Sequence, residues 1–299
     1  MSVILAHGSV ETSTAPEYIN GLLEAVQKGS QILQNKQHVL DAVEAVVNEL
    51  EDNPLYNAGL GSVLNRDGIA EMDGAIMDGQ SGRFAAVAAM RDVRHAISVA
   101  RRVMEETKHV VLAGEGATQF AREKGFPADN CITEDQLKSW QLAMRLLKEG
   151  QELDFSPYTG LKKETDTVGC VILDNHGKLA AGSSTGGSFL KLPGRVGDTP
   201  FIGGGIFASE HCAIVCTGRG EAFIKTLTAK YVDDQIRGGE DPETAACRAI
   251  ERLHQLTGET GGIIVVDALG RSAAVHNSYS FPVVRLHDGR AEEMKVLQI

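Results

Sequence analysis

The junction between a polar segment at residues 151–166 and the apolar run behind it constrains the fold of this chain most. The polar segment contains Pro157 and Gly160 and is typical of a linker. After it, short apolar runs separated by Gly, Asn and Asp follow one another quickly, which predicts a series of strands. Helices and strands occur in blocks and do not strictly alternate along the chain. This order favours a layered α+β fold over a doubly wound parallel sheet.

Hydrophobic periodicity predicts the individual elements on both sides of the linker. Residues 57–79 are rich in Gly, Ser, Asn and Asp and predict two strands joined by a turn. Residues 109–113 predict a buried strand. The expected helices cover residues 15–28, 38–52, 95–106, 117–124, 135–150, 221–237 and 242–257. The other expected strands cover residues 3–6, 84–90, 168–173, 178–184, 214–217, 262–266, 272–275 and 283–286.

Bulk composition excludes several classes of function. The 299 residues carry a net charge of −11, which argues against nucleic-acid or membrane-surface binding because both require a basic face. The five scattered cysteines are an odd number and do not suggest a disulfide framework. The N-terminus has no basic leader, and no apolar run approaches the roughly 18 residues of a membrane span. We therefore expect a cytoplasmic protein.

Thr167 opens the first apolar run after the linker and directly follows Asp166. A threonine hydroxyl inside a chain is a poor nucleophile, whereas a threonine at a chain N-terminus has its own α-amine as a base. Cleavage of the bond between Asp166 and Thr167 would create such a residue. It would also divide the chain into residues 1–166 and 167–299.

Three polar clusters follow this junction, at residues 182–187, 194–198 and 217–221. Each alone has an ordinary explanation: a strand exit, a turn with a solvated arginine, and the capped start of a helix. Their order downstream of Asp166 and Thr167 indicates that they serve one site.

Seven motifs over nearly the whole length give the chain a specific resemblance. It resembles the plant-type asparaginases, also called isoaspartyl aminopeptidases, of the N-terminal-nucleophile hydrolases. The matching motifs are His7-Gly8, NAGLGSVL at residues 57–64, EMDGAIMDG at 71–79, DTVG at 166–169, STGG at 184–187, GRVGD at 194–198 and TGRGE at 217–221.

The resemblance implies a fold, an activity and an assembly. The expected fold is an α+β, four-layer αββα sandwich in a single domain, residues 1–299, with a flexible linker at 151–166. Self-cleavage would give an α subunit, 1–166, and a β subunit, 167–299, assembled as a dimer of αβ units. The expected activity is an amidohydrolase that releases L-aspartate from L-asparagine and β-aspartyl dipeptides.

The resemblance also implies the roles of the catalytic residues. Thr167 is the nucleophile, with its free amine as general base and acid. The Thr217 hydroxyl and the Gly218 N–H form the oxyanion hole. Thr185 hydrogen-bonds the nucleophile, and Asn57 orients its amine.

Arg195 and Asp198 have the charges that an α-amino acid substrate requires. The planar guanidinium of Arg195 suits the α-carboxylate, and Asp198 suits the α-ammonium. Gly220 is expected to contribute a backbone N–H to the same carboxylate. For Asp73 and Asp78, turn capping is favoured over metal binding. The resemblance implies no cofactor beyond a structural sodium ion held by backbone carbonyls, which belong to Leu50, Glu51, Asn53, Tyr56, Ala58 and Leu60.

One position departs from the family pattern, and two other functions remain as alternatives. Ser9 stands where the family usually has a second Gly after His-Gly, so its Cβ is expected to affect processing or substrate fit. The first alternative is a threonine endopeptidase of the same fold. Arg195 and Asp198 argue against it, because a mid-chain residue has no free α-amine or α-carboxylate. The second is an unprocessed, inactive binding relative, which the intact threonine set disfavours.

Overall fold

The computed structural model describes residues 1–153 and 167–299, and within them it confirms a mixed α/β protein built from sheets and helices. Asp166 and most of the expected linker therefore lie outside the described residues. The helices are α1 (Pro16–Gln34), α2 (Val39–Asp52), α3 (Ala96–Glu106), α4 (Gly114–Glu123), α5 (Glu134–Lys148), α6 (Gly220–Thr226), α7 (Thr228–Arg237) and α8 (Pro242–Thr257).

The described strands form two sheets. The larger has the order β12-β11-β1-β5-β6-β2-β3-β4 and the smaller the order β13-β10-β9-β8-β7. The strands of the larger sheet are β1 (Val3–His7), β2 (Met72–Asp78), β3 (Phe84–Met90), β4 (Val111–Ala113), β5 (Thr167–Leu173), β6 (Leu179–Thr185), β11 (Val283–His287) and β12 (Arg290–Glu293). Those of the smaller sheet are β7 (Ile206–Ala208), β8 (Cys212–Gly218), β9 (Gly261–Asp267), β10 (Ser272–His276) and β13 (Leu297–Gln298).

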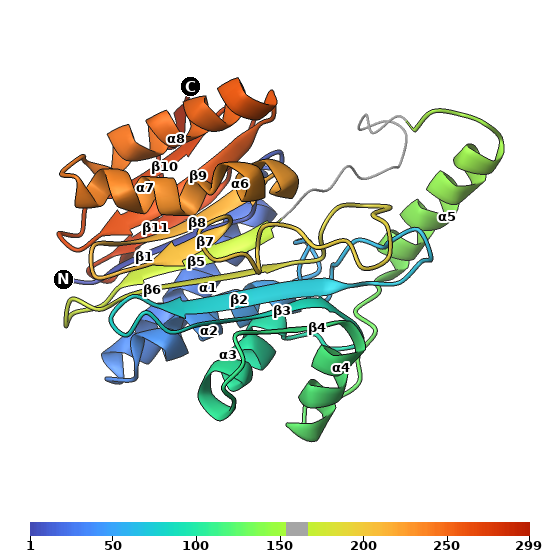
Figure 1. Cartoon of the computed structure of the whole chain (residues 1–299), viewed down its shortest axis with the longest axis horizontal. Helices are drawn as coiled ribbons and strands as arrows, with labels where there is room; N and C mark the ends of the chain where they lie inside the picture. Colours follow the sequence, from blue (N-terminus) through green and yellow to red (C-terminus); the bar gives the residue numbers. More distant parts are fainter. Residues whose placement is uncertain (154–166) are drawn as a thin grey trace.

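Alternating side chains of β5 divide the core. Val168, Cys170 and Ile172 pack with residues of α1 and α2, whereas Val171 and Leu173 pack with β8 and β9 of the other sheet. Because successive strand residues point to opposite faces, Thr167 lies on the face directed at the smaller sheet. A third apolar cluster joins the outer face of the smaller sheet to α7 and α8. Figure 1 shows the two sheets between these helices, with α5 projecting to one side.

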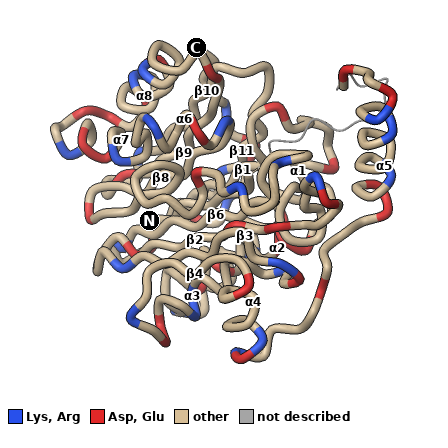
Figure 2. The backbone as a smooth tube through the Cα atoms, turned by 45° about the vertical axis from the view of Figure 1, so that its right-hand side comes forward, with Lys and Arg blue, Asp and Glu red and all other residues tan. Residues whose placement is uncertain are grey.

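The charged residues lie mainly outside the two sheets. In Figure 2 most charged positions lie on helices and connecting loops, and the strands are mostly tan. Strands that are buried on both faces require apolar or small side chains, and β1, β2, β3, β5 and β6 are buried throughout. None of the helices in the described ranges is long and apolar enough to cross a bilayer.

Local signals explain where several helices begin. The His38 side chain and Asp41 form a capping box at α2, and Thr133 caps α5. Asp241 accepts hydrogen bonds from the N–H groups of Glu243 and Thr244 at the start of α8.

The helix predicted over residues 221–237 is wrong at its centre. Leu227 has φ of 50°, and the chain forms two helices, α6 and α7, on either side of it. The N–H groups of Ala229 and Lys230 donate to the carbonyls of Gly204 and Gly203. This contact with a distant loop satisfies the first turn of α7, and the local sequence cannot reveal it.

Two strand predictions also need correction. Residues 109–113 do not form a buried strand, because β4 pairs only with β3 at the edge of the larger sheet and is largely exposed. Residues 57–79 contain one strand, β2, preceded by an isolated bridge between Leu64 and Ala70. The Asn65 side chain accepts from the N–H groups of Asp67 and Ile69 and turns the chain there.

Candidate active site

The described end of β5 brings two of the predicted threonines together. Thr167 is directly opposite Thr185 in the antiparallel pair of β5 and β6, and both are buried. Side chains directly opposite each other in such a pair lie on the same face of the sheet. The Thr185 hydroxyl also accepts a hydrogen bond of 2.9 Å from the Gly187 N–H.

The third predicted threonine, Thr217, approaches this end from the smaller sheet. A Cβ built on Gly169 of β5 would lie 2.5 Å from Val215 of β8, so the two strands are in close contact there. Thr217 is two residues beyond Val215 and is fully buried. Its hydroxyl lies 2.6 Å from the hydroxyl of Ser9, which follows β1 in the larger sheet. The strand ends of both sheets therefore meet at one place.

Gly218 follows Thr217 in a backbone conformation that favours glycine. Its φ is 136°, and a built Cβ would lie 2.8 Å from the carbonyl oxygen of Thr260. The sharp change of direction ends β8 and leads within two residues to α6.

Asn57 holds the loop that leaves β6. Its amide nitrogen donates to the Gly187 carbonyl at 2.7 Å, and its side-chain oxygen accepts from the Val63 N–H at 2.8 Å. Its own carbonyl accepts from the Gly186 N–H. These contacts fix the position of the residues directly behind Thr185. The resemblance assigns Asn57 to the amine of Thr167, and that role stays a prediction.

Asp198 is a buried carboxylate whose Oδ2 has no hydrogen-bond partner within the described ranges. Burial raises its pKa to about 7, and the nearby positive charge of Arg195 opposes this shift. A buried, unsatisfied carboxylate oxygen is costly and favours a cationic ligand. Gly220 leaves room for it, since a Cβ there would lie 2.9 Å from the Asp198 backbone nitrogen.

Arg195 forms a bidentate ion pair with Glu221 at the start of α6. Its Nε and one terminal nitrogen donate to the two carboxylate oxygens at 3.0 Å and 2.9 Å. The pair holds the plane of the guanidinium in one orientation. A Cβ on Gly220 would lie 3.0 Å from Asp198 Oδ1, and the charge of Arg195 acts on the Asp198 carboxylate. The roles of the three residues in substrate binding stay predictions.

Sequence reasoning missed the residues that hold the loop carrying Arg195 and Asp198. Glu71 accepts from the Gly194 N–H at 3.0 Å, and the Lys191 ammonium donates to the Glu71 carbonyl at 2.7 Å. Lys191 is buried, although lysine rarely is. Glu71 belongs to the motif at residues 71–79, so its importance could have been expected from the sequence. Nothing in the sequence around Lys191 indicates that this lysine is buried.

The two aspartates of the same motif have different roles. Asp78 caps a turn as predicted, because it accepts from the Gln80 N–H and the Ser81 hydroxyl. Asp73 does not cap a turn. It accepts from the N–H groups of Ala89 and Gly197, at 2.7 Å and 3.2 Å, and so ties β3 to the loop of Asp198. The spacing of the residues could not show this, because both partners are distant in sequence.

The loop at residues 50–60 is tightly curled at the end of α2. The carbonyls of Leu50, Glu51 and Asn53 each accept a backbone N–H, and a Cβ on Gly59 would lie 2.3 Å from the Glu51 oxygen. Among the described residues no cluster of His, Cys, Asp and Glu could hold a metal ion.

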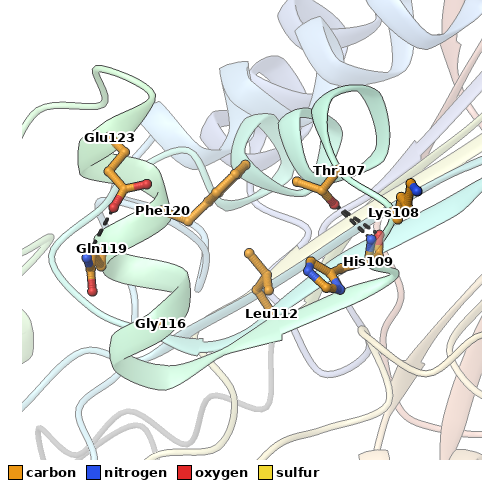
Figure 3. A pocket seen from close by; sticks show the side chains of 8 residues that line it. All are labelled: Thr107, Lys108, His109, Leu112, Gly116, Gln119, Phe120 and Glu123. Carbon is orange, nitrogen blue, oxygen red and sulfur yellow. Dashed lines mark hydrogen bonds between the residues drawn. The ribbon is translucent and has the colours of Figure 1, made fainter.

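A pocket of about 530 Å³ lies away from this site, between α4 and the chain around β4. Its lining comes from residues 107–123 and includes Leu112 and Phe120 (Figure 3). It shares no residue with the strand ends around Thr167.

Comparisons with known proteins show the family of this chain. The asparaginase family matches residues 2–294. The chain is 44% identical to a plant-type L-asparaginase of Thermococcus kodakarensis, over 98% of each chain. It is 43% identical to a plant-type L-asparaginase of Pyrococcus horikoshii, again over 98% of each. It is 37% identical to an isoaspartyl peptidase/L-asparaginase of Bos taurus, over 96% of this chain and 94% of the relative. This chain therefore belongs to the asparaginase family.

Proposed function

We propose that this enzyme hydrolyses the side-chain amide of L-asparagine and of β-aspartyl dipeptides to release L-aspartate, after it has cut itself between Asp166 and Thr167. The names of its relatives, plant-type L-asparaginase and isoaspartyl peptidase/L-asparaginase, support this substrate class. The single observation that carries the proposal is the meeting of Thr167, Thr185 and Thr217 at adjacent strand ends.

Self-cleavage requires no residue beyond those already proposed. The Thr167 hydroxyl attacks the carbonyl carbon of Asp166, and its proton passes to the departing amide nitrogen. The acyl group thus moves from nitrogen to oxygen. Water then hydrolyses the ester, which leaves the carboxylate of Asp166 and a free amine on Thr167.

In turnover the same hydroxyl attacks the side-chain carbonyl of the substrate. The free amine of Thr167 takes the hydroxyl proton and later gives it to the leaving ammonia or peptide amine. The Thr217 hydroxyl and the Gly218 N–H stabilise the oxyanion, and each such donor is worth on the order of 3 kcal/mol. Water then attacks the aspartyl ester and releases L-aspartate.

The charged side of the site fixes the orientation of the substrate. Arg195 receives the α-carboxylate, together with the Gly220 N–H, and Asp198 receives the α-ammonium. A substrate held at both charges presents its β-carbonyl in one orientation only. A threonine endopeptidase would not need the charges of Arg195 and Asp198, because a residue in the middle of a protein chain has no free α-carboxylate or α-ammonium.

The remaining features of the proposal concern assembly. We propose a single four-layer αββα domain over residues 1–299, a dimer of αβ units and a cytoplasmic location. A structural sodium would be held by the carbonyls at residues 50–60. The carbonyls of Leu50, Glu51 and Asn53 each keep a second lone pair beside the hydrogen bond that they accept, so the donor set fits a hard cation. No catalytic step passes through this ion.

A denaturing gel and a mass spectrum of the purified protein test the proposal. We expect two fragments, the smaller beginning at Thr167, and one intact chain for Thr167→Ala. The processed protein should then release L-aspartate from L-asparagine and β-aspartyl dipeptides. Intact wild-type protein after long incubation, or processed protein without amidase activity, would contradict it.

A further inference from the structure

The hydroxyl of Ser9 has no role in the proposed reaction, yet it lies inside the site. Ser9 is fully buried, and its oxygen lies 2.6 Å from the Thr217 oxygen. Along the register of β1 and β5, His7 is opposite Gly169. β1 ends at His7, and Ser9 lies two residues beyond it. Ser9 therefore approaches Thr217 from the end of the strand that pairs with β5, the strand of Thr167.

The backbone at Ser9 is unfavourable for any residue with a side chain. Its φ is 86°, in the left-handed region that favours glycine. The conformation is fixed by the Ser9 N–H, which donates to Nδ1 of His7 at 3.2 Å. Burial lowers the pKa of His7 to about 3, so this nitrogen stays an unprotonated acceptor at neutral pH. Outliers held in this way by their surroundings occur preferentially at functional sites.

Among the hydrogen bonds that join Ser9 to Thr217 and Val10, two arrangements of the two hydroxyl protons are possible. In the first, Thr217 donates to Ser9, and Ser9 donates to the Val10 carbonyl at 3.2 Å. In the second, Ser9 donates to Thr217, and the Thr217 proton is free to point at a ligand. Negative charge on a ligand favours the second arrangement, because a chain of hydroxyls donating in one direction polarises itself.

We propose that Ser9 is a positioning residue that donates its hydroxyl proton to Thr217 and so directs the Thr217 proton at the oxyanion. The inference rests on the proposed role of Thr217 and adds one residue to it. A glycine at position 9 has no side-chain donor, so no hydrogen bond from residue 9 would orient the Thr217 hydroxyl. The benefit arises only when the oxyanion forms, and it therefore raises kcat and leaves KM unchanged.

Two substitutions at position 9 separate the hydroxyl from the backbone strain. Ser9→Ala removes the hydroxyl and keeps the strained Cβ, whereas Ser9→Gly removes both. We expect each to lower kcat about five- to tenfold at unchanged KM, the size of one hydrogen bond. The Gly variant should have the higher melting temperature of the two. Rates are expressed per processed subunit, with the processed fraction taken from mass spectra, so that slow self-cleavage does not imitate a low kcat.

A double-mutant cycle with Thr217→Val tests the route through Thr217. Without the Thr217 hydroxyl, Ser9→Ala should have no further effect on kcat. Ser98→Ala serves as the control, because it removes another buried hydroxyl, bonded to Asn48 on a helix away from the site. The control should keep its kcat.

Three other outcomes would contradict the role of Ser9 or that of Thr217. Wild-type kcat in both Ser9 variants, or effects that add to that of Thr217→Val, would overturn the inference alone. A higher kcat in the Ser9 variants would show that Ser9 withdraws the Thr217 proton, which is the opposite of the inference. Wild-type kcat in Thr217→Val would overturn the oxyanion role of Thr217 and the inference with it.

Discussion

The site has two sides that are built in different ways. The hydroxyl side, Thr167, Thr185 and Thr217, lies at the ends of strands from two sheets and carries no formal charge. The charged side, Arg195 and Asp198, lies on a loop that is tied down by residues from elsewhere. Strand ends are fixed by ladders of backbone hydrogen bonds, whereas a loop depends on individual side chains for its position.

Because the two sides are built differently, substitutions on them should have different effects. On the hydroxyl side a lost oxygen changes the chemistry and leaves the fold intact. On the charged side the anchors decide the geometry, and a buried carboxylate without a partner destabilises the free protein. We therefore expect substitutions on the first side to act on kcat and those on the second to act on KM and stability.

The largest effect is expected at the nucleophile. Thr167→Ala removes the attacking oxygen, and loss of a nucleophile lowers kcat by about 10⁴-fold or more. Thr167→Ser keeps the oxygen and should retain measurable self-cleavage and turnover. Kinetics of the purified proteins on L-asparagine check both, with melting temperatures as the control for folding. Comparable residual rates in Ala and Ser variants would remove Thr167 from the mechanism.

The second effect is expected at the guanidinium. Arg195→Lys replaces a planar fork with a point charge, and loss of a charge-assisted hydrogen bond of about 1.5–3 kcal/mol raises KM roughly 10- to 100-fold. The value of kcat should change much less. Arg102 lies on the exposed side of α3 and pairs with Glu106, so Arg102→Lys is the matched control and should leave KM and kcat unchanged. A fall in kcat at constant KM would place Arg195 on the chemical side instead.

The third effect depends on pH. Burial raises the pKa of Asp198 to about 7, so the free enzyme loses the negative charge that holds the substrate ammonium as the pH falls through 7. We expect kcat/KM to fall on that acid limb. In Asp198→Asn, which should also have a higher KM, the limb should be less steep but should remain, because the Thr167 amine must still be unprotonated to act as the base. A pH profile of both proteins at low substrate concentration checks this.

The same group should act on stability in the opposite direction. The folded-state pKa lies above the ordinary value of 3.8, so wild-type stability falls as pH rises from about 4 through 7. Asp198→Asn should therefore melt at a higher temperature than wild type at pH 8, with a smaller difference at pH 5. An equal difference at both values would mean that Asp198 is not buried as a charge in the free protein.

The smallest effect is expected from steric crowding behind Asp198. A Cβ at Gly205 would lie 2.6 Å from both the carbonyl and Oδ2 of Asp198, so Gly205→Ala should destabilise by about 1–3 kcal/mol and raise KM. At Gly116 in α4 a Cβ meets nothing within 4 Å, and Gly116→Ala should stabilise by about 0.5–1 kcal/mol. Thermal unfolding compares the pair, and equal shifts would refute the tight packing around Asp198.

Sequence reasoning succeeded where the signal is local. Apolar runs predicted β3 and α8 with their observed bounds, and the ordered motifs indicated the family. Prediction from the sequence failed where contacts with distant residues determine the local structure. Residues 221–237 carry one continuous helical pattern, yet the carbonyls of Gly203 and Gly204 end it at Leu227. The short strands β7, β12 and β13 were missed, because two to four residues show no periodicity.

The sequence by itself determined the mixed α/β class and the family and proposed the reactive side chains, because periodicity and ordered motifs are properties of the chain. Only the tertiary structure decided that Asp73, Glu71 and Lys191 anchor the Asp198 loop and that Ser9 reaches Thr217. Hydrogen bonds between residues more than a hundred positions apart depend on how two sheets pack. No local pattern in the chain records them.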